Sequence, residues 1–204
     1  MKRSLLLFTA LLALGLSAAF AQNPVKVRIG FNPTQNSDQL KPAVQAIADF
    51  IEKEFKGTVE VETFIPTDYR GLIEAMRGGN LDFAFFPPDG YVVAHQDVGA
   101  TVLLKSVRGT SPYYWSAIVV RKDSGIKNVQ GLEGKTIAWV DKNSAAGYVF
   151  PRAALIDAKL DPDKLFAKQV FAGKHDAAVL AVLNKSVDAA ATFANDDKNK
   201  SGAW

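Results

Sequence analysis

The sequence predicts an α/β protein made of two lobes, each with a mostly parallel sheet flanked by helices. Stretches in which apolar and polar residues alternate, as they do in strands, take turns with stretches whose apolar residues recur at helical spacing. This order starts near residue 25 and starts again after the extended segment 111–122, which predicts the second lobe. In the first half, polar or proline-rich loops follow the strands at 32–38, 66–68 and 87–90. Ligands of parallel sheets bind at this carboxyl edge.

The first 21 residues are expected to be a cleaved secretory signal, outside the fold. Lys2 and Arg3 precede the apolar segment 5–16, and the Ala-Phe-Ala of residues 19–21 matches the small-x-small cleavage pattern. A membrane anchor is the alternative, but the apolar run is only just long enough to span a bilayer, and no basic flank follows it. Removal of the signal takes two of the 24 basic residues and none of the 21 acidic ones, which leaves a net charge of +1.

Composition narrows the functional classes. The basic residues are scattered, without a long run, so nucleic-acid binding is not expected. The chain has no cysteine, which excludes disulfides and a lipid anchor on an N-terminal cysteine. Beyond the signal, no apolar stretch is long enough to span a bilayer, so the mature chain is not expected to insert into a membrane. These features favour an exported periplasmic protein, which we expect to be a monomer.

The first lobe is assigned to residues 25–110. The predicted strands cover residues 25–31, 59–65, 81–86 and 101–107, and the strand at 81–86 is expected to be buried. The predicted helices cover residues 40–55, a segment around Leu72, Ile73 and Met76 that stops at Gly78, and a short segment around 91–94.

A crossover and the second lobe follow. Residues 111–122 are assigned to the crossover, with a strand at 114–122, and residues 123–192 to the second lobe. The second lobe's predicted strands cover residues 135–140, 168–171 and 187–193, and its helices begin near Ser144 and His175. Residues 193–204 are assigned to the start of a return crossover.

The sequence does not favour an enzyme. Its two histidines, His95 and His175, lie in different units, and no cysteine can act as a nucleophile. Motifs of serine hydrolases, zinc proteases and phosphate-binding loops are missing. Metal-ligand types are too sparse for a zinc site, and adjacent acids such as Asp196 and Asp197 are typical of a solvated surface. We therefore expect no catalytic residues, no metal and no cofactor.

The segment Asn143–Gly147 is the most informative stretch for binding. Its small residues begin a helix, and a helix start presents unpaired N–H groups at the positive end of the dipole. Such a start can seat an oxyanion, with the Ser144 hydroxyl as a further donor. Alternatively, Ser144 is only a cap. Pro151, which should bend the helix, favours the first interpretation.

Two further helix starts and an aromatic cluster are weaker candidates. His175 could donate to an oxyanion or be a plain cap. Tyr69 could offer a hydroxyl or pack as a core aromatic. The cluster lies where the two units join, and it could pack there or line a cleft; it comprises Tyr113, Tyr114 and Trp115.

Four segments together resemble one family, the periplasmic substrate-binding proteins of phosphonate, phosphite and phosphate ABC transporters. They are residues 67–92, 111–126, 132–155 and 173–192. The resemblance implies a type 2 periplasmic binding protein fold that closes on a small phosphorus oxyanion and delivers it to a transporter permease. It also implies a set of ligand-binding residues: Tyr69 and Tyr114 from the first lobe and crossover, and Ser144, Ala145, Ala146 and His175 from the second lobe.

The chain departs from the family pattern in three respects. Ala145 and Ala146 stand where the family often has further hydroxyls. Asn195, followed by Asp196, stands where members that select aminoalkylphosphonates carry an acid, which puts an amino-bearing ligand in doubt. The sequence ends near the expected return crossover, so we expect a truncated chain with an incomplete first lobe. Two other functions stay open: an enzyme on the same fold and the sensor domain of a signalling receptor.

Overall fold

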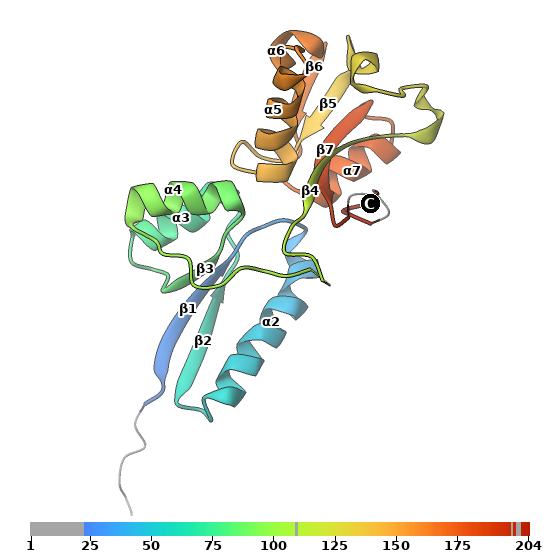
Figure 1. The fold of residues 1–204 in the computed structure, drawn as a ribbon. Coiled ribbons are helices and arrows are strands. Elements are labelled where there is room, and N and C mark those ends of the chain that lie inside the picture. Colours follow the sequence, from blue (N-terminus) through green and yellow to red (C-terminus); the bar gives the residue numbers. More distant parts are fainter. Residues whose placement is uncertain (1–22, 109, 197, 199–200) are drawn as a thin grey trace, which may run out of the picture.

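The computed structural model describes residues 23–108, 110–196, 198 and 201–204, and it contains two α/β lobes (Figure 1). The expected secretory signal lies outside the described residues. The first lobe is drawn in blue to green and the second in yellow to red, and the predicted fold class is confirmed. No helix among the described residues is both long and apolar enough to cross a membrane.

The first lobe contains a three-stranded parallel sheet in the order β2-β1-β3. Its strands are β1 (Val25–Phe31), β2 (Val59–Phe64) and β3 (Phe83–Phe85), and its helices are α2 (Ser37–Glu54), α3 (Tyr69–Arg77) and α4 (Pro88–Val98). Helices cover both faces because strand residues alternate. Ile29 and Phe31 pack with Val44 of α2, whereas Gly30 faces Leu72 of α3 so closely that a Cβ would lie 2.4 Å from its Cδ1.

Local capping explains where the first-lobe helices begin. The side chain of Asn36 accepts a hydrogen bond from the N–H of Asp38 and starts α2, and Asp68 accepts one from the N–H of Gly71 and starts α3. Pro88 is the first residue of α4, a position where the missing N–H of proline costs nothing. Each of these helices therefore starts within or directly after one of the three carboxyl-edge loops.

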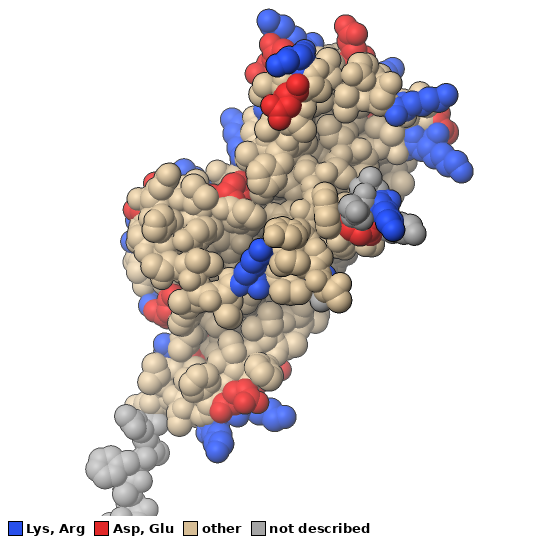
Figure 2. Space-filling view, viewed as in Figure 1, with Lys and Arg blue, Asp and Glu red and all other residues tan. Residues whose placement is uncertain are grey.

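One predicted strand of the first lobe is wrong, and another is confirmed only in part. Residues 101–107 form no strand, and Leu104 in this segment is 90% exposed. Of 81–86, only Phe83–Phe85 is a strand; it lies at a sheet edge with both phenylalanines exposed. An apolar pattern becomes a strand only where a second strand offers its hydrogen bonds, and among the described residues β3 pairs with β1 alone. Figure 2 shows broad uncharged areas on this face of the molecule.

The second lobe contains a four-stranded sheet in the order β4-β7-β5-β6, parallel except for the antiparallel pair β4-β7. Its strands are β4 (Trp115–Val120), β5 (Thr136–Trp139), β6 (Lys168–Phe171) and β7 (Ala189–Ala194). The main helices are η3 (Ala145–Val149), α5 (Phe150–Asp157), α6 (Pro162–Leu165) and α7 (His175–Leu183); two short 3-10 segments, η1 (Lys122–Ser124) and η2 (Val129–Leu132), follow β4. The strand expected in the crossover at 114–122 thus forms as β4, and it is an edge strand of the second sheet.

Alternate residues of the central strands build two cores, one on each face of this sheet. Ile137 and Trp139 pack with Leu155 of α5, while Ala138 packs with Ala178 of α7. Tyr69, which comes from the first lobe, belongs to the core on the α7 side. The two lobes are therefore in direct contact at the carboxyl edges of both sheets, as Figure 1 shows.

Candidate ligand-binding site

The turn after β5 leads into the helix start that the sequence singled out. The Oγ of Ser144 accepts a hydrogen bond from the N–H of Gly147 at 3.1 Å, so the interpretation of Ser144 as a cap is confirmed. Its own N–H donates to the carbonyl of Asp141 at 3.0 Å. As an acceptor in the cap, the Ser144 hydroxyl keeps its proton for another partner. The role of Ser144 in binding an oxyanion stays a prediction.

The small residues of this helix start are needed for packing as well. Ala145 and Ala146 are buried, and the carbonyl of Ala146 accepts a hydrogen bond from the Oγ of Ser116 at 2.7 Å. A Cβ at Gly147 would lie 2.4 Å from Cγ2 and 2.5 Å from Cβ of Val140. The strands β4 and β5 thus approach this backbone from inside the lobe. The bare helix start consequently has a structural reason that needs no ligand.

The first turn of the helix is irregular. Residues 145–149 form a π-helical turn, in which the N–H groups of Tyr148 and Val149 both donate to the carbonyl of Ser144 at 3.0 Å. Regular α-helix begins at Phe150, with Pro151 in its first turn. The distortion expected from Pro151 therefore takes the form of a π turn. Such turns occur frequently at functional sites.

Three oxygen atoms of the first lobe face this region without a hydrogen-bond partner. Among the described residues, they are the buried side-chain polar atoms left unpaired: Oδ1 of Asn32, the hydroxyl of Tyr69 and Oδ1 of Asp89. They come from the three carboxyl-edge loops or the helix turns directly after them. Unpaired buried polar atoms are rare and costly, so their convergence indicates a place where another molecule binds.

Tyr69 lies deepest of the three and is only 3% exposed. Its hydroxyl lies beside the side chains of Ser144 and Asn32, which act on its pKa as weak hydrogen-bonding neighbours, but the geometry with either falls short of a full hydrogen bond. Burial raises the pKa of Tyr69, which keeps the phenol neutral and able to donate. Both interpretations of Tyr69 from the sequence are therefore compatible, because its ring packs in a core while its hydroxyl has no partner.

Asp89 and Tyr114 complete the side of the site that faces the helix start. Burial raises the pKa of Asp89, against the opposite effect of the N–H groups of Gly90, Asp89 itself and Ala145. Burial also raises the pKa of Tyr114, and the nearby charge of Arg108 opposes this shift. Tyr113, by contrast, is exposed.

His175 begins α7 and is 4% exposed. Its Nδ1 lies 2.9 Å from the Oγ1 of Thr192, and its ring contacts the ring of Phe193 edge-on. Burial, followed by the nearby charge of Arg108, lowers the pKa of His175 to about 4, so the imidazole is neutral at physiological pH. The hydrogen bond of Nδ1 orients the ring and leaves Nε2 as the second polar atom.

Arg108 is a cation that the sequence did not single out. Its guanidinium lies 4.7 Å from the ring centroid of Tyr114 and 5.1 Å from that of Phe193. It also donates to the Oδ1 of Asn195 at 3.2 Å. The carboxylate of Asp196 is engaged locally by the N–H of Lys198 and by Ser201.

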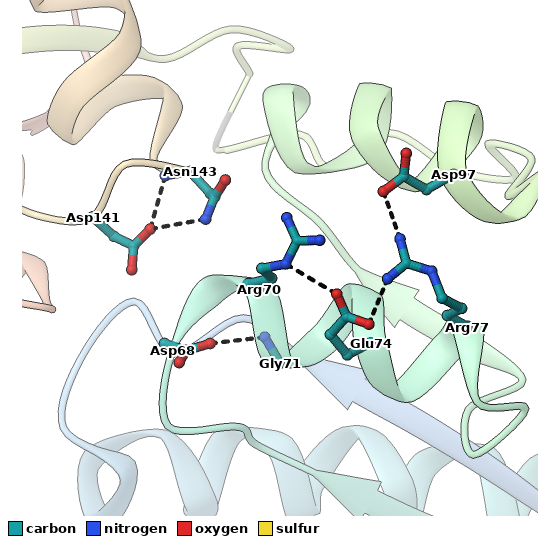
Figure 3. Close-up of polar contacts among 8 residues, drawn as sticks. All are labelled: Asp68, Arg70, Gly71, Glu74, Arg77, Asp97, Asp141 and Asn143. Carbon is teal, nitrogen blue, oxygen red and sulfur yellow. Dashed lines mark hydrogen bonds and ion pairs between the residues drawn. The ribbon is translucent and has the colours of Figure 1, made fainter.

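A groove of about 370 Å³ opens between the lobes beside this cluster. One wall holds Asp68 and Arg70 of the first lobe; the opposite wall holds residues of the turn after β5, including Asp141 and Asn143 (Figure 3). Asn143 donates to Asp141 through its N–H at 2.8 Å, which fixes the turn before Ser144. Ion pairs also link α3 to α4, with Arg77 contacting both Glu74 and Asp97.

The described residues contain no group of three or more histidine, aspartate or glutamate side chains that could hold a metal ion. The cluster built above consists of hydroxyls, backbone N–H groups, one neutral imidazole and one carboxylate. The hydroxyl, N–H and imidazole groups of this set suit the binding of a small anion, whereas the carboxylate by itself does not.

Comparison with known proteins gives consistent matches. Residues 29–199 match the model of the family described as ABC transporter, phosphonate, periplasmic substrate-binding protein. The chain is 33% identical to the phosphate-import protein PhnD of Mycolicibacterium smegmatis and to the phosphonates-binding periplasmic protein of Escherichia coli. These alignments cover 83% and 97% of this chain and 56% and 60% of those proteins. The chain thus spans little more than half the length of these relatives.

A solved structure supports the same fold. PhnD1 from Prochlorococcus marinus, in complex with methylphosphonate, matches with a TM-score of 0.72 and 26% identity. The match covers 83% of this chain and 64% of that one.

Proposed function

Since this chain belongs to the family of periplasmic substrate-binding proteins of phosphonate ABC transporters, we propose that it is an extracytoplasmic solute receptor. It binds a phosphorus oxyanion between its lobes and delivers it to the permease of an ABC importer. Relatives named for phosphate import and phosphonate binding, and a similar structure that holds methylphosphonate, support this ligand class. Export by a cleaved signal peptide is part of the proposal.

The observation that carries the proposal is that unpaired polar groups of the first lobe converge on the helix start of the second lobe. The hydroxyl of Tyr69 and the helix start at Ser144 come from different lobes and lie side by side. A tetrahedral oxyanion presents several acceptor oxygens in different directions, and it can therefore pair with both. Hydroxyl, N–H and imidazole donors fixed in a buried site lose little entropy when they bind such an anion.

The second lobe supplies most of the proposed donors. The N–H groups of Ala145 and Ala146 lie at the positive end of a helix, where the N–H of Ala145 also faces the carboxyl of Asp89, and Ser144 keeps a hydroxyl proton. The neutral ring of His175 can add Nε2 as a donor if Nδ1 accepts from Thr192. Because these donors are neutral, we expect the site to bind its anion through hydrogen bonds more than through ion pairs.

The test uses a matched pair of tyrosine variants. Tyr69→Phe removes a hydroxyl that has no partner within the protein, so the free energy of unfolding should change little. A lost hydrogen bond to a charged ligand weakens binding by roughly 1.5–3 kcal/mol, or about 10- to 150-fold. Tyr113→Phe makes the same change at an exposed ring and should bind like the parent protein.

Calorimetric titration with methylphosphonate, phosphite and phosphate gives the affinities of the three proteins. Phosphorus NMR after each titration shows whether the ligand is recovered unchanged, as a receptor requires. If Tyr69→Phe binds as tightly as Tyr113→Phe, the placement of Tyr69 at the ligand is wrong. If the parent binds none of the three anions, the proposed function itself is wrong.

A further inference from the structure

Asp89 places a carboxyl group directly at the proposed oxyanion seat. It is the second residue of α4, and its carboxyl lies against the N–H of Ala145, the first residue of η3. A buried acid at a site that should attract anions needs an explanation, because two negative groups repel each other strongly where water is excluded.

No neighbouring cation explains this acid. Among the described residues, Asp89 forms no ion pair, and the ionisable side chains that influence it or are influenced by it are Asp141, Tyr69 and Tyr114. These groups are acidic or neutral, and they cannot balance its charge. Burial accordingly raises the pKa of Asp89.

Stabilising the start of α4 accounts for the presence of an acid at this position, but it does not account for the buried, unpaired Oδ1. An acid in the first turn favours α4 through the helix dipole, and N–H groups of Asp89 itself and Gly90 lie close to the carboxyl. Oδ1 nevertheless is buried and has no hydrogen-bond partner. An acid that only stabilised a helix start would gain more by turning this oxygen to water.

The three unpaired atoms share one chemical property. Oδ1 of Asn32 and Oδ1 of an ionised Asp89 can only accept hydrogen bonds, and the Tyr69 hydroxyl can accept as well as donate. Besides the Tyr69 hydroxyl, the first lobe thus offers two acceptors to a ligand whose oxygens already face the donors of the second lobe. A ligand that satisfies both sides must carry a donor of its own.

We propose that Asp89 determines specificity by accepting a hydrogen bond from a proton-bearing phosphorus oxyanion, and that it thereby rejects anions without such a proton. This inference rests on the function proposed above. Phosphorus oxyanions lose their second proton only near neutral pH, so an appreciable fraction of them still carries a P–OH group at about pH 6.5. Sulfonates have the same shape but no acidic proton. A sulfonate beside Asp89 would leave the carboxylate without a hydrogen-bond donor, and the two negative charges would repel each other.

The donor is placed on the oxyanion itself and not on a distant substituent. Asp89 lies at the N–H of Ala145, so an oxyanion on the neighbouring N–H of Ala146 and the Ser144 hydroxyl would lie directly beside the carboxyl. An ammonium group at the far end of a longer ligand would not reach this position while the oxyanion occupies the same helix start.

The experiment compares methylphosphonate with methanesulfonate, which differ little in shape. Calorimetry at pH 6.5 measures both affinities for the parent, Asp89→Asn and Asp49→Asn; Asp49 is exposed on α2 and serves as the matched control. The parent and Asp49→Asn should prefer methylphosphonate by at least about 10-fold, the effect of one lost charge-assisted hydrogen bond. In Asp89→Asn the new side-chain amide can donate to a sulfonate oxygen, so this variant should bind methanesulfonate about 10-fold more tightly and lose most of the preference.

The possible outcomes separate this inference from the proposed function. If the parent binds both anions equally, or if Asp89→Asn keeps the full preference, Asp89 does not set specificity although the receptor function stands. If the parent binds neither, the receptor function falls and this inference falls with it. If Asp89→Asn does not fold, Asp89→Ser, which keeps a helix-starting oxygen, takes its place with the same expected loss of preference.

Discussion

The buried histidine gives a quantitative prediction about stability and pH. Burial lowers the pKa of His175 from 6.5 to about 4. Because the folded-state pKa lies below the value of the unfolded chain, the unfolded state binds more protons between these two values. The free energy of unfolding should therefore be unaffected by this group above pH 6.5 and should fall as the pH drops from 6.5 to about 4.

The size of the effect follows from the width of this pH window. The pKa of His175 falls from 6.5 to about 4, and each pKa unit corresponds to about 1.36 kcal/mol. The free energy of unfolding should therefore be lower by roughly 3 kcal/mol at about pH 4 than above pH 6.5. For a protein of ordinary stability this is a large fraction of the total. Ligand affinity should depend on His175 differently. As a neutral donor it should contribute equally at pH 7 and pH 8, where its protonation does not change.

Urea unfolding at pH 7.5, 6.5, 5.5 and 4.5 tests the prediction. His175→Gln removes the titrating ring but keeps polar atoms, and it should flatten the loss of stability below pH 6.5. His95→Gln, which replaces an exposed ring that contacts the carbonyl of Ala100, is the matched control and should retain the parent's pH dependence. A parent-like slope in His175→Gln, or an NMR titration of His175 near pH 6.5, would refute the reasoning.

Two substitutions at the helix start carry further predictions. Gly147→Ala forces a Cβ to within 2.4 Å of Val140 Cγ2, so it should lower the free energy of unfolding by about 1–3 kcal/mol in urea titrations, and an unchanged midpoint would contradict the packing. Ser144→Ala removes both the cap of Gly147 and the proposed ligand donor, so it should cost about 1 kcal/mol of stability and also weaken methylphosphonate binding. A loss of stability without a loss of affinity would reduce Ser144 to a cap.

The layered α/β architecture could be predicted from the sequence, but which strands pair with one another could not. Alternation in β1 and β2 and helical spacing in α2 are local properties, and capping residues such as Asn36 and Asp68 mark helix starts within a few positions. The pairing of strands is not local. Residues 101–107 have the apolar composition of a strand, but they lie unpaired in the described part of the chain, and no pattern within that short segment reveals it.

In the site, too, residues marked by local sequence features could be predicted, and residues placed there by the fold could not. Ser144 and Tyr69 could be found because they stand at helix starts, which sequence signals mark. Asp89 and Asn32 lie in loops that were expected at the ligand-binding edge, yet nothing local distinguishes them from the other polar residues of these loops. No sequence pattern pointed to Arg108 as a residue near the site, because its contacts with Tyr114 and Asn195 depend on how the chain returns to the second sheet.

The distribution of donors and acceptors connects ligand choice with closure of the two lobes. In the proposed site the second lobe contributes donors, from the helix start at Ser144 and from His175, whereas the first lobe contributes the Tyr69 hydroxyl and the acceptors of Asn32 and Asp89. An anion without a proton can pair with the donors, but bringing the first lobe against it would bury the two acceptor oxygens unpaired. A protonated oxyanion pairs with both sides, so it alone lowers the free energy of the closed arrangement. In such a receptor the proton on the ligand would decide both how tightly it binds and whether the lobes stay together.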